Sequence, residues 1–135
     1  MKTLKPKPEY LSATLALSPD PAKFDFFPRP ELVTRVELLC TEVTSLCPIT
    51  HQPDYSTVKL TYSPDKLCLE TKSLKEYLFT YRNYGNFCES MSTKIINDLF
   101  PLLQPHLLHV KVEFTSRGGI TITSFSYKEK DHDKV

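Results

Sequence analysis

The spacing of the hydrophobic residues changes twice along this chain, and that change narrows the possible folds more than any other feature. Hydrophobic and polar residues first alternate, then hydrophobic residues recur every three or four positions, and then the alternation returns. Alternation predicts strands, and the longer period predicts helices. The predicted strands are 34–40, 56–62, 107–116 and 120–126, and the predicted helices are 73–82 and a segment from Phe87 to Pro101 or Pro105. The order β-β-α-α-β-β therefore predicts an α+β fold.

Gly118 and Gly119 separate the last two predicted strands. Glycine supplies the positive φ that a tight hairpin turn requires, so these strands are expected to pair. We expect one antiparallel sheet with both helices on one of its faces. Such a unit leaves the other sheet face and two edge strands uncovered, and the chain is therefore expected to form oligomers.

The length of 135 residues suits one domain. Residues 1–30 hold six of the eleven prolines and predict an extended N-terminal arm without regular structure. The sequence KEKDHDKV at 128–135 predicts a solvated, charged C-terminal tail. The folded domain is therefore expected to span 31–127.

Charge and composition exclude several classes of protein. The chain has 17 basic and 16 acidic residues, so its formal net charge of +1 creates no bulk field for nucleic acid. No apolar run approaches the roughly 20 residues of a membrane span, and residues 1–10 lack the apolar stretch of a signal peptide. A cytoplasmic location is expected. The four cysteines and four histidines form no C-x-x-C or C-x-x-H pair, so no metal site is predicted.

The segment SLCPITHQPD, residues 45–54, contains one cysteine within a proline-bounded bend that ends on an acid. Pro48 and Pro53 predict a rigid loop that holds Cys47 and Asp54. A lone cysteine is most often a small buried hydrophobe, whereas a thiolate nucleophile needs an accessible loop such as this one. Asp54 is either a turn-capping residue or a general acid, and the second role requires burial to raise its pKa. Both interpretations are open for each residue.

The segment ETKSLK, residues 70–75, begins the first predicted helix, with Ser73 as the expected N-cap. Lys72 and Lys75 add positive charge to the positive end of a helix dipole, which is unfavourable unless an anion binds there. The segment is either an ordinary capping segment or a phosphate site made by Lys72, Ser73 and Lys75.

Two further positions each allow two interpretations. Glu89, at the start of the second predicted helix, either stabilises the helix dipole or accepts hydrogen bonds from two adjacent donors of a flat heterocycle. Arg117, just before the two glycines, is either a hairpin residue or a phosphate contact.

Three motifs, SLCPITHQPD, ETKSLKEYLFTYRNYGNFCE and FTSRGGI, occur in an order and spacing that resemble the 7-cyano-7-deazaguanine reductase (QueF) family of nitrile reductases. The likeness covers roughly residues 36–124, and the length resembles the single-domain branch of the family. The resemblance implies a tunnelling fold (T-fold) whose subunits form ring-shaped homo-oligomers, such as a decamer of two pentamers, with active sites at subunit interfaces. It also implies the reduction of a deazapurine nitrile to an aminomethyl group in queuosine biosynthesis, with two molecules of NADPH used in sequence.

The resemblance assigns roles to individual residues. It implies that Cys47 attacks the nitrile carbon to give a covalent thioimide and that Asp54 protonates the nitrile nitrogen. Glu89 would bind the edge of the deazapurine ring. The cofactor-binding residues that it implies are Glu70, Lys72, Ser73 and Lys75 of the E-x-K-S-x-K run, together with Arg117 and Gly118 of the R-G-G turn.

The chain departs from the family at Cys88, which occupies the position of a histidine next to the ring-binding glutamate. The resemblance therefore places Cys88, with Glu89, in the substrate site. Three alternatives compete with the reductase: a QueF-like amidinotransferase acting on tRNA, the zinc enzyme GTP cyclohydrolase I, and a T-fold purine or pterin binder without catalysis. The retained lysines and the near-neutral charge count against the first, and the missing zinc-ligand spacing counts against the second.

Overall fold

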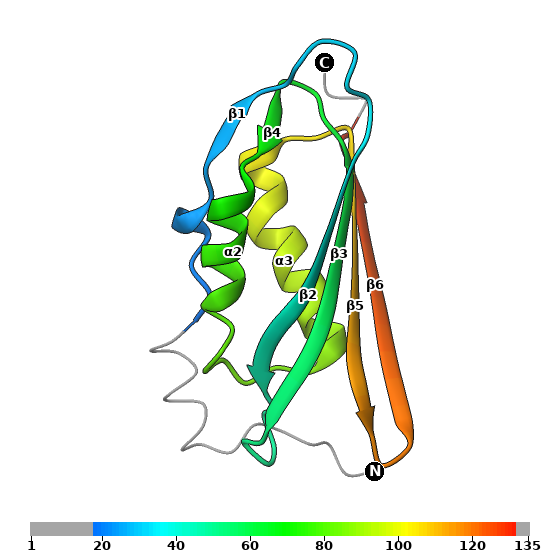
Figure 1. Ribbon diagram of the computed structural model, residues 1–135. Helices are drawn as coiled ribbons and strands as arrows, with labels where there is room; N and C mark the ends of the chain where they lie inside the picture. The colour runs from blue at the N-terminus through cyan, green and yellow to red at the C-terminus, as the bar shows by residue number, and fades with distance from the viewer. Residues whose placement is uncertain (1–17, 132–135) are drawn as a thin grey trace.

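A computed structural model of the protein describes residues 18–131 (Figure 1). The chain forms one short 3-10 helix, two α-helices and six strands in the described part. In chain order these are η1 (Pro21–Lys23), β1 (Phe26–Pro28), β2 (Val36–Leu46), β3 (Pro53–Ser63), β4 (Leu67–Leu69), α2 (Thr71–Phe79), α3 (Cys88–Leu103), β5 (Leu107–Arg117) and β6 (Ile120–Glu129). The predicted order β-β-α-α-β-β is confirmed for the six long elements, and the α+β class with it.

The four long strands form one antiparallel sheet in the order β2-β3-β5-β6. Both α-helices cover the same face of this sheet, as predicted (Figure 1). The edges of the sheet are β2 and β6. The helices run in opposite directions, so α2 begins at one end of the sheet and α3 begins at the other (Figure 1).

The first two long strands extend further than the hydrophobic pattern predicted. β2 continues beyond Cys40 through an irregularity in its register and ends only at Leu46, while β3 begins at Pro53. Proline is tolerated as the first residue of a strand because no ladder hydrogen bond is needed there. The predicted loop is therefore reduced to residues 47–52, and Asp54 lies inside a strand and not in the loop.

The core lies between the sheet and the two helices. Alternate side chains of β3 and β5 point toward the helices, and the stripe of α3 that repeats every four residues packs against them. The side chains with at most 1% exposure in this layer include Val58, Leu60, Tyr62, Leu108, Val110, Val112, Met91, Ile95 and Leu99. The packing of this layer fixes the sheet against the helices, and it thereby fixes the position of the sheet end that carries the candidate site.

The prediction of an unstructured arm over 1–30 is wrong for residues 18–30. β1 pairs with β4, and Phe24 is buried with its ring centroid 4.2 Å from that of Tyr77. The aromatic residues of this segment therefore order it in spite of its prolines, because they cover the outer side of α2. Residues 1–17 of the predicted arm lie outside the described residues.

The predicted tail is also partly wrong, since β6 runs on to Glu129 and Lys130 Nζ lies 2.7 Å from a carboxylate oxygen of Asp65. Residues 132–135 lie outside the described residues. Within the described part, no helix is both long enough and apolar enough to cross a membrane.

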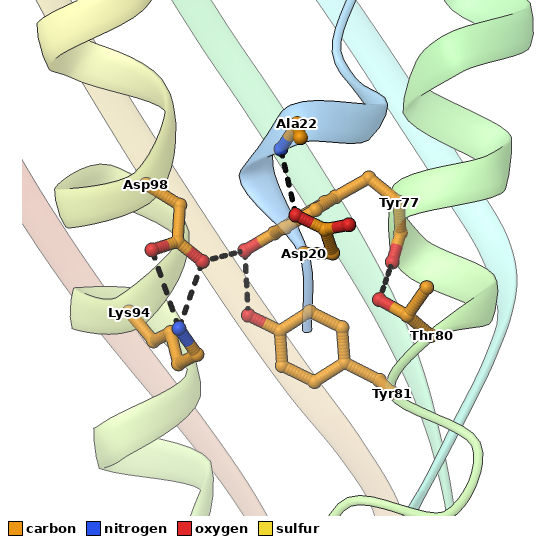
Figure 2. A network of polar contacts seen from close by, with 7 residues as sticks. All are labelled: Asp20, Ala22, Tyr77, Thr80, Tyr81, Lys94 and Asp98. Carbon is orange, nitrogen blue, oxygen red and sulfur yellow. Dashed lines mark hydrogen bonds and ion pairs between the residues drawn. The ribbon is translucent and has the colours of Figure 1, made fainter. Parts of the chain in front are cut away.

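A buried polar network ties the two helices together (Figure 2). The Tyr77 hydroxyl donates to Asp98 Oδ2 at 2.7 Å and lies 2.9 Å from the Tyr81 hydroxyl. Lys94 Nζ lies 2.9 Å from the same carboxylate oxygen of Asp98. Burial raises the pKa of both tyrosines, so their hydroxyls remain neutral hydrogen-bonding groups. The network holds the end of α2 beside α3 and thereby positions the segment that joins them.

Candidate active site

The turn between β2 and β3 brings Cys47 and Asp54 to one end of the sheet. Cys47 directly follows β2, and Asp54 is the second residue of β3, opposite Ser45 in the register. The turn is closed by two backbone hydrogen bonds, from Cys47 N to Gln52 O (2.9 Å) and from His51 N to Cys47 O (3.0 Å). This local geometry supports the prediction that one rigid segment holds both residues, although the segment is the end of a β-hairpin and not a free loop.

The thiol of Cys47 has a lowered pKa. Burial raises the pKa of this half-buried group, but hydrogen bonds from the Thr50 side chain, from the backbone of Thr50 and Ile49, and from Arg117 together lower it by more. The Thr50 backbone N–H donates to Cys47 Sγ across 3.5 Å. Cys47 therefore has the thiolate character that a nucleophile needs, together with access from solvent.

The carboxyl group of Asp54 has a raised pKa. Its side chain is 2% exposed, and this burial raises the pKa, while the positive charge of Arg117 opposes the rise. The separation between Arg117 Nη1 and Asp54 Oδ1 is 2.6 Å. Asp54 thus meets the requirement stated for a general acid, namely burial that raises its pKa.

Arg117 lies with the thiol and the acid. The resemblance to the QueF family grouped Arg117 with Lys72 and Lys75 as predicted cofactor residues, whereas in the structure it lies at the end of β5, in contact with Asp54. β5 pairs directly with β3, and this pairing brings Arg117 across to Asp54. Gly118 and Gly119 follow with φ of +58° and +78°. The positive φ explains why a glycine occupies position 118 of the turn. The predicted contact of Gly118 with a cofactor stays a prediction.

The two residues predicted to bind substrate start α3 at the same end of the sheet, but they point differently. Cys88 is 3% exposed, and its thiol donates to Val112 O at 3.4 Å. Burial raises its pKa, so it is a core thiol that packs against the sheet. Glu89 is exposed and forms no side-chain hydrogen bond or ion pair with another described residue. These contacts favour Glu89 over Cys88 as a residue that binds a ligand.

The four predicted cofactor residues of the ETKSLK segment lie at the other end of the sheet (Figure 1). Glu70 and Thr71 line a shallow pocket with Val36 and Leu38 at the start of β2, whereas Cys47 follows the end of that strand. Cys47 lies nine positions after Leu38, which at about 3.3 Å per residue is roughly 30 Å. The first residues of this segment therefore lie far from Cys47 within one chain, whereas Lys75 lines a second groove that runs along β2 as far as Thr44.

The start of α2 differs from the predicted cap. Glu70, and not Ser73, is the N-cap, and its carboxylate accepts from Lys72 N (2.7 Å) and Ser73 N (2.8 Å). The Ser73 hydroxyl is buried; it accepts from Asp25 N at 2.8 Å and donates to Glu70 O at 2.7 Å. The N–H groups that a phosphate would use are therefore occupied by Glu70. Lys72 and Lys75 remain exposed, without an ion pair to any described side chain.

One residue at the Cys47 end was missed by sequence analysis. Asn86 is 6% exposed and its backbone N–H donates to Leu46 O at 3.0 Å, one residue before Cys47. An asparagine beside a glycine predicts an exposed turn, so its burial gave no signal in the sequence. In residues 18–131 no group of three histidine, cysteine, aspartate or glutamate side chains is arranged to hold a metal ion.

Comparison with known proteins agrees with this geometry. The model of the family described as QueF-like protein matches residues 53–133. A relative from Helicobacter pylori (strain Shi470), named NADPH-dependent 7-cyano-7-deazaguanine reductase, is 44% identical over 93% of this chain and 82% of its own length. A relative of the same name from Streptococcus mutans serotype c is 54% identical over 67% of this chain. The chain spans only 56% of the length of that second relative.

A solved structure shares the fold. The archaeosine synthase QueF-Like in its apo form superposes with a TM-score of 0.65 at 21% identity, covering 70% of this chain and 92% of that chain. The likeness confirms the expected T-fold of the subunit.

Proposed function

Because the chain belongs to the QueF-like protein family, we propose that it is an NADPH-dependent reductase that converts the nitrile of 7-cyano-7-deazaguanine to an aminomethyl group. The relatives that carry this activity in their names support the substrate and the cofactor. The observation that carries the proposal is the pairing of a thiol of lowered pKa with a buried acid of raised pKa at one hairpin end. The product belongs to queuosine biosynthesis, and we place the reaction in the cytoplasm, where thiols stay reduced.

The first chemical step uses the two residues together. The Cys47 thiolate attacks the nitrile carbon and forms a C–S bond, while Asp54 gives its proton to the nitrile nitrogen, so that the triple bond becomes the C=N bond of a thioimide. A nitrile is a weak electrophile, and protonation at nitrogen as sulfur adds avoids a free anion. Asp54 must then take up another proton before each later protonation, and Cys47 leaves as the thiolate when the reduced adduct collapses to an imine.

A bound NADPH would supply the hydride for each of two reductions, and with two protons the nitrile would become the amine. Lys72 and Lys75 fit a phosphate group of such a cofactor because both are exposed cations that form no ion pair with a described side chain. Glu70 and Ser73 do not fit that role, since their polar groups are used within the start of α2. Glu89, exposed at the Cys47 end, suits the donor edge of the deazapurine ring.

The start of α2 and Cys47 lie at opposite ends of the sheet, and this separation supports active sites built from two subunits (Figure 1). We propose a ring-based homo-oligomer, such as a decamer of two pentamers, in which Lys72 and Lys75 of one subunit face Cys47 of another. The exposed edge strand β2 and the adjoining groove of about 740 Å³ between β2 and α2 support this assembly. Lys75 lines that groove.

The first experiment measures the intact mass of the protein after mixing with the nitrile alone, and then NADPH absorbance after adding cofactor. We expect an adduct of the nitrile's mass that disappears as NADPH is consumed. Cys47→Ser should prevent the adduct, whereas Cys40→Ser, a half-buried thiol on β2, should leave it intact. An adduct that never consumes NADPH would instead favour the amidinotransferase, and the absence of any adduct would favour a binding protein.

The assembly has its own test. Cys47→Ser and the double variant Lys72→Ala/Lys75→Ala should each be inactive alone. Mixing the two after dissociation and reassociation should restore part of the activity, because some interfaces then combine an intact thiol with intact lysines. No recovery from mixed oligomers would contradict the shared site.

A further inference from the structure

A cluster of hydroxyl groups joins the start of α3 to the edge strand β6. The Ser124 hydroxyl on β6 donates a three-centre hydrogen bond to Cys88 O at 2.8 Å and to Ser92 Oγ at 2.9 Å. Ser92 Oγ in turn donates to Glu89 O at 3.2 Å. Ser92 and Ser124 are 1% and 9% exposed, so water does not compete for these bonds. The cluster therefore holds the backbone of the first turn of α3 against the sheet.

Every proton of this cluster has an acceptor. Ser92 Oγ and Ser126 Oγ lie 2.7 Å apart, and Thr93 Oγ1 lies 3.1 Å from Ser126 Oγ. A hydroxyl has one proton and two lone pairs. Because Ser92 uses its proton on Glu89 O, Ser126 donates to Ser92 and Thr93 donates to Ser126. The chain of hydrogen bonds thus ends on the backbone carbonyl of Glu89.

The start of α3 depends on this cluster because it has no side-chain cap. Phe87 is the N-cap, and its side chain forms no capping hydrogen bond with a described residue. In α2, by contrast, the carboxylate of the N-cap Glu70 accepts from Lys72 N at 2.7 Å. The first N–H groups of a helix lack partners within the helix, so an uncapped start is less well held. The hydroxyls of β6 supply the order that a capping residue would give.

Glu89 lies in this first turn, and its own side-chain contacts do not hold it. The side chain is exposed and forms no hydrogen bond or ion pair with another described residue. The direction of its carboxylate is therefore set by the backbone, whose carbonyl group accepts from Ser92. A carboxylate that pairs with two adjacent donors of a flat ring needs a defined direction, because hydrogen bonds weaken steeply when they are misaligned.

We propose that Ser92 and Ser124 are positioning residues for substrate binding: their hydroxyls fix the first turn of α3 to β6 and so hold the Glu89 carboxylate in the direction that binds the deazapurine ring. The inference rests on the proposed function, in which Glu89 binds that ring. Both serines are buried, so each acts through the backbone of the turn that carries Glu89. They change the affinity for the ring, and they leave the reaction of Cys47 with bound nitrile unchanged.

Calorimetric titration of the full chain with 7-deazaguanine, which has the ring but no nitrile, measures this affinity. Ser124→Ala removes the three-centre bond and Ser92→Ala removes the bond to Glu89 O, and we expect each to weaken binding by roughly fivefold to tenfold. Steady-state kinetics with the nitrile should show the same factor in KM and a nearly unchanged kcat. Ser124→Thr keeps the hydroxyl and should recover most of the affinity.

Two further measurements separate positioning from a general loss of structure. Glu89→Ala removes the ring contact itself, so adding Ser124→Ala to it should weaken binding no further. The N–H groups of Ser92 and Thr93 close the first turn of α3. Without any ligand, their hydrogen exchange in Ser124→Ala should be faster by roughly fivefold to tenfold.

Ser56→Ala is the matched control for the loss of a buried hydroxyl. Ser56 is 3% exposed and donates to Val43 O at 3.3 Å, so its bond lies within the sheet and not on α3. We expect this variant to bind 7-deazaguanine as the wild-type protein does and to keep wild-type hydrogen exchange at the start of α3.

Wild-type affinity in both Ser92→Ala and Ser124→Ala would overturn the inference, and so would a full additional loss when Ser124→Ala is combined with Glu89→Ala. The measurements also separate two failures. A protein that binds the ring and shows the coupling between Ser124 and Glu89, but consumes no NADPH, would refute the proposed function alone. An active reductase whose ring affinity and hydrogen exchange do not respond to either serine would refute the inference alone.

Discussion

Replacing Arg117 by glutamine tests whether charge, and not packing, links this residue to Asp54. In the wild-type protein Arg117 Nη1 lies 2.6 Å from the buried carboxyl group. A pair of unit charges at that distance is worth about 6 kcal/mol at an effective dielectric constant of about 20. The Arg117 side chain is 50% exposed, however, so solvent screens most of this energy, and we take about 1–2 kcal/mol as the remainder.

The expected effect depends on pH in a defined direction. The pKa of Asp54 in the folded protein is raised above its value in the unfolded chain, which is about 3.9. Because the folded pKa is the higher one, Asp54 ionises less favourably in the folded protein than in the unfolded chain. Its contribution to the free energy of unfolding is therefore largest below the unfolded pKa and declines until pH passes the folded pKa. Without Arg117 the folded pKa rises by about one further pH unit, and the decline extends to a higher pH.

Urea denaturation at a series of pH values measures this difference. We expect Arg117→Gln to match the wild-type unfolding free energy closely below about pH 4 and to lose about 1–2 kcal/mol above the folded pKa. The control is Arg35→Gln, which removes an exposed arginine paired with Glu37 and should change the free energy by less than about 1 kcal/mol throughout. An equal loss for Arg117→Gln at acid and neutral pH would refute the electrostatic reasoning.

Three further predictions concern the framework. Tyr77→Phe should lower the unfolding free energy by about 1–2 kcal/mol in urea titrations, because Asp98 loses a buried hydrogen bond; no loss would show that the network contributes nothing. Phe24→Ala should cost about 3 kcal/mol by the same measurement, whereas Phe27→Ala, 42% exposed, should cost clearly less, and equal losses would contradict the docking of the N-terminal segment. Glu70→Gln should destabilise the fold at neutral pH but not in acid, since its lowered pKa makes its contribution vanish as pH falls through that pKa; a thermal melt at each pH checks this.

Much of the framework could be predicted from local patterns. The alternation and helical periods located all six long elements, because the side-chain period follows from backbone geometry that each segment adopts by itself. The sequence also predicted that Cys47 and Asp54 lie close together. Asp54 follows Cys47 by only seven positions, and the two prolines between them restrict the backbone. The positive φ at Gly118 and Gly119 was predicted for the same reason.

Other features depended on contacts between distant segments. Arg117 contacts Asp54 only because β5 pairs with β3. Phe24 is buried, and not part of an extended arm, only because it packs against Tyr77 of α2. The burial of Asn86 likewise follows from a bridge to the end of β2. No local period carries such information, since the alternation of a strand defines its two faces but not its neighbours.

The sequence by itself thus determined the elements, their order and the short segment that joins the thiol to the acid, because each depends on neighbouring residues. The tertiary structure decided the partners: the pairing of β5 with β3 brought Arg117 to the acid, and the fold placed the start of α2 at the end of the sheet opposite to Cys47 (Figure 1). The pKa of Cys47 and that of Asp54 depend on burial and on those partners, and burial exists only once strands that are distant in sequence have paired.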